Sequence, residues 1–184
     1  MQAKTKKLII FISFFVAIVV FVVIFFRLNF AIHQPRHAPQ LSVTLTVDDL
    51  PQQHIQALQL SNKWTFFDVG GRWRGGYTAT AELPLDFWAF APWDFSEVIF
   101  YLDYTNGKIE LHFSDDFPPD SLYFRRWNVE LIGSSTDLWP LNPFTEVENN
   151  TIIINNSGND YIYEVRAIWS QGESTYTFRI NGLR

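Results

Sequence analysis

The chain has 184 residues and a net charge of −5, and it contains seven tryptophans, 18 phenylalanines and no cysteine. The absence of cysteine excludes a disulfide framework, a thiolate metal site and a lipid-modified cysteine. Four of the 14 basic residues and none of the 19 acidic residues lie in the first 27 positions, so residues 28–184 have a net charge of −9. We expect this acidic part to be repelled by nucleic acid and by anionic surfaces.

The N-terminal segment predicts a membrane span. Leu8–Phe26 is an uninterrupted apolar run whose only hydroxyl belongs to Ser13. A helix of this length is about 28 Å long, close to the thickness of the hydrocarbon core of a bilayer. Three lysines precede the run, which predicts a cytoplasmic N-terminus with residues 28–184 outside the cell membrane. The alternative is a cleaved secretory signal, which usually has a shorter apolar core and a small-residue cleavage site.

The chain is therefore expected to contain four segments. They are a cytoplasmic tail (1–7), a transmembrane signal anchor (8–26), a tether (27–40) and one outer domain (41–184). His33 and His37 in the tether have a helical metal-binding spacing, but the neighbouring prolines disfavour a helix there. We expect no metal at this position.

The first part of the outer domain predicts strands. Leu41–Val47 alternates strictly between apolar and hydroxyl side chains, which is typical of a half-buried strand. Gln53–Leu60 fits either a helical turn or a strand. Further strands are predicted at Lys63–Phe67 and Tyr77–Leu83.

Two segments in this region predict loops. Gly70–Gly76 is rich in glycine and is expected to be a flexible loop that presents Trp73 between two arginines. Pro84–Phe95 carries five aromatic residues and two prolines in twelve positions and is also loop-like.

The second part of the domain predicts hairpins. Asn106-Gly107 is a preferred pair for a tight turn and predicts a hairpin between Val98–Tyr104 and Ile109–Phe113. A long strand is predicted at Ser121–Ile132 and a short one at Thr151–Ile154. The last hairpin is predicted to join Tyr161–Trp169 and Ser174–Ile180 through the Ser170–Glu173 turn.

This pattern predicts an all-β domain. Roughly seven to nine short strands, regular turn signals and no clear soluble helix favour a β-sandwich behind the N-terminal helix. Trp64, Trp127 and Trp169 lie in predicted strands and are expected in the core.

The C-terminal sequence resembles a known group of proteins. The ending Y-I-Y-E-V-R-A-I-W-S-Q-G-E-S-T-Y-T-F-R-I resembles the last hairpin of uncharacterised exported proteins and lipoproteins of Firmicutes. Shorter matching stretches are Pro84-Leu85-Asp86-Phe87, Pro119-Asp120-Ser121 leading into Arg125-Arg126-Trp127, and Lys63-Trp64-Thr65-Phe66. The resemblance spans Leu41 to Ile180 and implies an immunoglobulin-like extracellular sandwich, without an activity. This chain differs from the group in having a transmembrane anchor instead of a lipidated cysteine.

The sequence contains no recognisable catalytic motif. None of its four histidines lies in a serine or cysteine nucleophile motif, and His112 is expected to point outward beside Glu110. Asp115, Asp116 and Asp120 lack the spacing of a calcium loop. We therefore expect no enzyme activity, no metal and no cofactor.

The remaining tryptophans are candidates for binding. Trp73, Trp88, Trp93 and Trp139 lie in loop-like contexts, and Trp73 is flanked by Arg72 and Arg74. Tryptophan and arginine dominate binding hot spots. The predicted function is a protein-interaction or surface-sensing module with an unknown extracellular partner, and the alternative is a carbohydrate- or wall-binding module. In a purely structural interpretation, Trp88 and Trp93 cap the core and the Arg-Trp-Arg loop is simply solvated.

Overall fold

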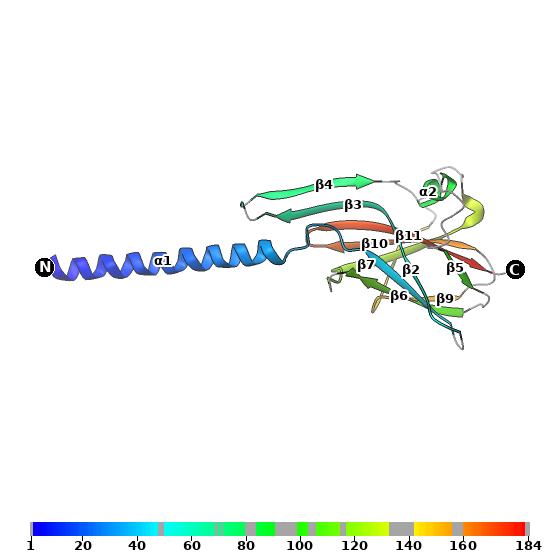
Figure 1. Ribbon diagram of the computed structural model, residues 1–184, viewed down its shortest axis with the longest axis horizontal. Helices are drawn as coiled ribbons and strands as arrows, with labels where there is room; N and C mark the ends of the chain where they lie inside the picture. The colour runs from blue at the N-terminus through cyan, green and yellow to red at the C-terminus, as the bar shows by residue number, and fades with distance from the viewer. Residues whose placement is uncertain are drawn as a thin grey trace. The chain divides into compact units, whose positions relative to one another are not determined.

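The computed structural model describes residues 2–47, 50–68, 70, 72–79, 84–90, 99–102, 106–114, 117–132, 142–155 and 160–182. The chain forms two compact units, each built from two segments. The first contains Met1–Arg36 and Thr65–Arg74, and the second contains His37–Trp64 and Gly75–Arg184. Figure 1 shows that the first unit begins with one long helix and that the second is built mainly from strands.

The helix α1 extends over Gln2–His33. Its apolar side chains from Phe11 to Phe30 are exposed all around the helix, as expected for a segment that faces lipid. The stretch Phe11–Ala31 is long and apolar enough to cross a membrane. The helix continues past Phe26, so the prediction of a non-helical tether is wrong for its first residues. Leu28, Phe30 and Ala31 continue the apolar pattern, and no proline interrupts it before Pro35.

The first unit also contains the turn between strands β3 (Leu58–Phe67) and β4 (Trp73–Ala79). The prediction of a flexible loop at Gly70–Gly76 is wrong from Trp73 onward, because β4 begins there. Asp68 organises the turn: its N–H donates to the Arg72 carbonyl at 2.8 Å, and its carboxylate accepts from the Arg72 N–H at 2.9 Å. The Arg74 guanidinium donates to the same carboxylate at 2.9 Å and holds the pKa of Asp68 below its usual value.

The smaller sheet of the second unit has the strand order β2-β1-β6-β9 and is antiparallel. The predicted strand at the start of the domain is confirmed, and the ambiguous Gln53–Leu60 segment forms β2 and the beginning of β3. The strands of this sheet are β1 (Leu41–Thr46), β2 (Gln53–Gln56), β6 (Asn106–Phe113) and β9 (Thr151–Asn155). Its core face carries Leu41, Val43, Leu45, Ile109, Leu111, Ile152 and Ile154.

The predicted hairpin around Asn106-Gly107 is wrong. The two residues lie inside β6, where Asn106 is opposite Asn155 and Gly107 is opposite Ile154. Strand β6 is paired with β1 on one edge and with β9 on the other, so neither edge is open to the preceding strand. That strand, β5 (Ile99–Leu102), instead pairs in parallel with the last strand of the other sheet.

The larger sheet has the order β4-β3-β11-β10-β7-β8, with β5 beside β11. The predicted C-terminal hairpin is confirmed, with Trp169 opposite Gly172. The predicted long strand from Ser121 ends at Asn128, because the Asn128 side chain accepts from the Glu130 N–H and begins the 3-10 turn η3 (Val129–Leu131). The remaining strands are β7 (Ser121–Asn128), β8 (Thr145–Glu146), β10 (Tyr161–Trp169) and β11 (Gly172–Gly182).

The two sheets pack face to face through aromatic rings. The ring of Phe113 on β6 lies 5.5 Å from Trp169 on β10 and 6.1 Å from Tyr176 on β11, both edge to face. Trp64 packs edge to face on Trp169 at 5.3 Å. The prediction of an all-β domain behind a helix is confirmed. Within the described ranges, strands β1 to β11 exceed the expected seven to nine, because β2, β5 and β8 are short pieces.

One soluble helix was not predicted. Helix α2 (Pro84–Phe90) begins with proline and has Asp86 in its first turn, both of which favour a helix start. Its Leu85 and Trp88 form a second apolar cluster with Trp127 and Ile162. This cluster lies on the face of the larger sheet that does not contact the smaller sheet, because Ile162 alternates with the core-facing Tyr163 along β10.

Candidate functional site

The outer face of the larger sheet has two different parts. Helix α2 and its cluster cover one part with apolar side chains, and Trp88 Nε1 donates to Thr177 Oγ1 there at 3.1 Å. The other part carries polar and charged side chains from neighbouring strands. On β10 the two parts follow one another: Ile162 belongs to the apolar cluster, whereas Glu164 and Arg166 lie further along the same face.

A buried ion pair lies in the polar part. Glu164 on β10 is directly opposite Arg125 on β7, and the guanidinium donates to the carboxylate at 2.6 and 2.9 Å. Trp127 Nε1 donates to the same carboxylate at 3.2 Å. Both charged side chains are 5% exposed. Such a bidentate, hydrogen-bonded geometry is required before a buried pair can offset the cost of desolvating two charges.

Aromatic rings enclose the guanidinium of Arg125. Its central carbon lies 4.8 Å from the ring centroid of Trp127 and 4.3 Å from that of Phe144. These contacts add a cation–π attraction and exclude water from the pair. These contacts therefore hold the Arg125 side chain in a fixed orientation.

A second ion pair is more accessible. Arg166 on β10 donates to the Glu173 carboxylate on β11 through Nε at 3.0 Å and also through Nη2. The two side chains are 42% and 39% exposed. Lys63 on β3 is opposite Glu173 in the strand register and is exposed. Glu173 is held by Arg166, and no ion pair of Lys63 occurs among the described residues. The Lys63 ammonium is therefore available to a ligand.

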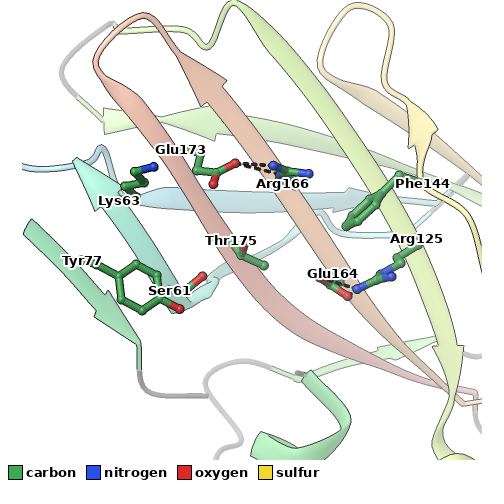
Figure 2. A pocket seen from close by; sticks show the side chains of 9 residues that line it. All are labelled: Ser61, Lys63, Tyr77, Arg125, Phe144, Glu164, Arg166, Glu173 and Thr175. Carbon is green, nitrogen blue, oxygen red and sulfur yellow. Dashed lines mark hydrogen bonds and ion pairs between the residues drawn. The ribbon is translucent and has the colours of Figure 1, made fainter. Parts of the chain in front are cut away.

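These side chains line a pocket of about 270 Å³ on the outer face of the sheet. Figure 2 shows how side chains from β3, β4, β7, β10 and β11, together with Phe144, surround it. The lining residues are Ser61, Lys63, Tyr77, Arg125, Phe144, Glu164, Arg166, Glu173 and Thr175. The pocket combines charges of both signs, three hydroxyl-bearing residues and two aromatic rings, a composition suited to binding a polar segment.

The pocket lies beside the last strand of the sheet. In the described part of the chain β4 pairs only with β3, and all of its residues are exposed. Asn62 Nδ2 on β3 donates to Thr78 Oγ1 on β4 at 2.6 Å, which ties the two strands together. Gly75 and Gly76 leave the backbone of β4 uncovered, and a Cβ at Gly76 would meet no atom within 4 Å.

The predicted binding residues that the structure describes differ in exposure. Trp73 is 64% exposed, as expected, and Arg72 and Arg74 are exposed beside it. Trp88 is 8% exposed and lies on α2 against an apolar cluster, which agrees with the purely structural interpretation and not with a surface loop. Trp93 and Trp139 lie outside the described residues. The expected core positions of Trp64, Trp127 and Trp169 are confirmed, since these residues are 4%, 2% and 4% exposed.

The histidines occupy ordinary positions. His112 points outward with its Nε2 3.9 Å from Glu110, as predicted, and His54 Nδ1 shares a 2.9 Å hydrogen bond with Thr44. Over the described ranges, no three histidine or acidic side chains come together in a way that could hold a metal ion. Asp115 and Asp116 lie outside these ranges.

The pocket was missed because its residues are scattered through the sequence. A signal was present: Glu164 and Arg166 interrupt an apolar strand on alternate positions. Alternation predicts that both side chains share one face, but it does not predict which residues lie opposite them.

Comparisons with known proteins place the chain in no family. A scan against known protein families finds no match, and a search of curated proteins finds none.

Proposed function

We propose that this chain is a membrane-anchored, extracytoplasmic recognition module, in which the outer face of an immunoglobulin-like β-sandwich binds an extended segment of a protein partner. It has no catalytic role in this proposal. The observation that carries the proposal is the charged pocket beside the uncovered edge of β4.

The anchoring part of the proposal is supported by α1. The stretch Phe11–Ala31 is apolar apart from Ser13, Arg27 and Asn29, and lysines precede it whereas the acidic residues all follow it. This charge distribution favours a cytoplasmic N-terminus and an outer second unit. Single-pass anchoring keeps the module at the cell surface, where its partner is encountered.

The binding part is supported by the chemistry of an unpaired strand edge. An extended segment adds to such an edge through main-chain hydrogen bonds, and its alternate side chains enter adjacent pockets. The exposed glycines of β4 allow close approach. Lys63 then favours an acidic side chain on the partner, while the paired Arg166 and Glu173 offer hydrogen bonds.

Co-purification tests the proposal. The full-length protein is crosslinked in cells, purified from solubilised membranes, and its partners are identified by mass spectrometry. The Lys63→Glu variant is expected to lose the partner at least about ten-fold, because it places a like charge against the acidic side chain. Lys108→Glu is the matched control, since Lys108 is an exposed lysine of the smaller sheet that pairs with Glu110 at 2.5 Å.

The same preparation distinguishes the alternative function. A carbohydrate- or wall-binding module would sediment with purified wall polysaccharide in the absence of protein partners. Protease treatment of intact cells tests the topology, because digestion of the second unit only after lysis would contradict an outer location.

A further inference from the structure

The turn between β3 and β4 belongs to the same compact unit as α1. The Gln34 side chain, 7% exposed, accepts a hydrogen bond from the Phe67 N–H at 2.7 Å through its Oε1. This hydrogen bond ties the turn to the residue that directly follows the C-terminal end of α1.

This attachment defines the depth of the turn relative to a bilayer. Gln34 lies three residues beyond Ala31, the end of the candidate span, which corresponds to about 4–5 Å along a helix axis. The polar interface of a bilayer extends roughly 5–8 Å on each side of its hydrocarbon core. This candidate span extends five residues beyond the apolar run that ends at Phe26 and includes Arg27, whose long side chain can extend toward the headgroups. A span that ends at Ala31 places Gln34 and the turn within the interface.

The exposed side chains of the turn have the chemistry of an interfacial anchor. Trp73 is 64% exposed and packs edge to face on Phe67, with ring centroids 5.5 Å apart. Tryptophan is enriched at the interface because its ring is apolar and its N–H is polar. Arg72 and Arg74 flank it, and long basic side chains reach the phosphate level while their stems lie along apolar surface.

The local charge of the turn also differs from that of the rest of the outer part. Thr65–Arg74 contains two arginines and one aspartate, whereas residues 28–184 carry an excess of acidic residues. Asp68 forms an ion pair with Arg74 at 2.9 Å, so the net positive charge of the turn resides on Arg72. An anionic bilayer surface attracts this turn and repels the rest of the outer part.

We propose that the β3–β4 turn, Thr65–Arg74, is a second membrane contact, in which Trp73 inserts at the interface and Arg72 and Arg74 bind lipid phosphates. This inference rests on the proposed membrane anchoring by α1. Under it, Trp73 contacts lipid and not the protein partner of the pocket.

The absence of cysteine allows a direct depth measurement in the full-length protein. A single cysteine replaces Gly70, an exposed residue of the turn, which leaves Arg72, Trp73 and Arg74 in place, and carries an environment-sensitive fluorophore. The protein is reconstituted in vesicles of phosphatidylcholine and phosphatidylglycerol in equal parts. Quenching is compared for nitroxides at the lipid headgroup, nitroxides deep in the acyl chain, and iodide in the water.

The expected result at position 70 is strong quenching by the headgroup nitroxide and protection from iodide. Adding Trp73→Ala is expected to lower the headgroup quenching at least about two-fold, because the interfacial ring is lost. Tyr77→Ala is the matched control: Tyr77 is the other exposed aromatic residue of β4, belongs to the second unit and is 62% exposed. It is expected to leave the quenching unchanged.

A labelled cysteine at Phe21, in the middle of the candidate span, separates the two possible failures. If position 21 is quenched by the deep nitroxide but position 70 is accessible to iodide and insensitive to lipid nitroxides, the anchoring stands and this inference is wrong. If position 21 is not quenched either, the anchoring and this inference both fail. Protection of position 70 from iodide without any lipid quenching indicates a protein contact and also overturns the inference.

Discussion

Glu164 and Arg125 lie directly opposite each other on β10 and β7, joined by two hydrogen bonds where both side chains are 5% exposed. The pair belongs to the candidate pocket and also to the interior of the protein. Its two charges are tolerated only together, because each one alone is a buried charge without a counterion. The pocket wall and the stability of the sheet therefore depend on the same contact.

Replacing Glu164 by glutamine should strongly destabilise the protein. The amide keeps the size of the side chain but leaves the Arg125 charge uncompensated, at a cost of about 3–5 kcal/mol in the free energy of unfolding. Urea unfolding of the full-length protein in detergent micelles, followed by tryptophan fluorescence, measures the change.

Two further variants serve as controls for this pair. The double variant Arg125→Met with Glu164→Leu should recover most of the loss, because it removes both charges together. Arg166→Met breaks the half-exposed pair with Glu173 and should cost less than about 1 kcal/mol. A loss below about 1 kcal/mol for Glu164→Gln would contradict the burial of an ionised pair.

Gly172 should not tolerate any side chain. It begins β11 with a φ of +156°, and a Cβ there would lie 1.9 Å from the carbonyl oxygen of Lys63. Backbone atoms of a paired strand cannot move aside without disturbing the pairing. Gly172→Ala is therefore expected to lower the free energy of unfolding by about 3 kcal/mol or more, or to prevent folding. Gly76→Ala is the matched control, since a Cβ at Gly76 meets nothing within 4 Å. Equal thermal stability of both variants would contradict this close approach of β3 and β11 at Gly172.

Two buried tyrosines should respond differently to loss of their hydroxyl groups. Tyr176 Oη donates a hydrogen bond to the Pro39 carbonyl, so Tyr176→Phe leaves a buried acceptor unpaired and should cost about 1–2 kcal/mol. Tyr163 Oη is buried and has no hydrogen-bond partner within the described ranges, and its ring stacks on Phe178 at 5.1 Å. Tyr163→Phe should change the free energy of unfolding by less than about 0.5 kcal/mol. Urea unfolding that ranks the two variants in the opposite order would refute this contrast.

Stability should fall in strongly alkaline solution. Burial raises the pKa of Tyr163 and of Tyr176 from 10.0 to about 12, although Arg126 opposes the rise at Tyr163 and hydrogen bonds from Ser174 and Gln59 oppose it at Tyr176. Between these pH values the unfolded chain loses phenol protons that the folded chain retains, so the free energy of unfolding decreases as pH rises. The loss is about 2–3 kcal/mol per tyrosine over the whole interval and is absent below pH 10.

The variant carrying both Tyr163→Phe and Tyr176→Phe isolates this contribution from the titration of lysines. Its urea midpoint should decline less between pH 9 and pH 11 than that of the unchanged protein. An identical decline in both proteins would show that the two phenols do not titrate abnormally.

The elements that follow from local pattern were predictable. A run without charge predicts α1, strict alternation predicts β1, and two alternating segments around a turn predict the β10–β11 hairpin. The hairpin at Asn106-Gly107 failed because β6 pairs with β1 and β9, and those pairings join residues distant in the sequence. A local turn preference is weaker than two complete strand pairings.

The candidate site depends almost entirely on such distant pairings. Lys63, Arg125 and Glu173 come from three separate parts of the sequence, and only the strand register places them around one pocket. Trp88 shows a different error. Its aromatic, proline-bounded sequence suggested exposure, whereas it lies on the short helix α2 and is buried against the larger sheet. Exposure of Trp73 was predictable from its glycine-rich surroundings.

Site-specific photocrosslinking tests the central claim, recognition through the pocket and the β4 edge, most directly. A photoreactive phenylalanine analogue replaces either Tyr77, which is 62% exposed in the pocket lining, or Ile153, which is 73% exposed on β9 of the other sheet. In intact cells, the account predicts a discrete crosslinked protein at position 77 that disappears with Lys63→Glu, and no such product at position 153. The account is contradicted if position 77 yields no protein product, or if positions 77 and 153 yield the same one.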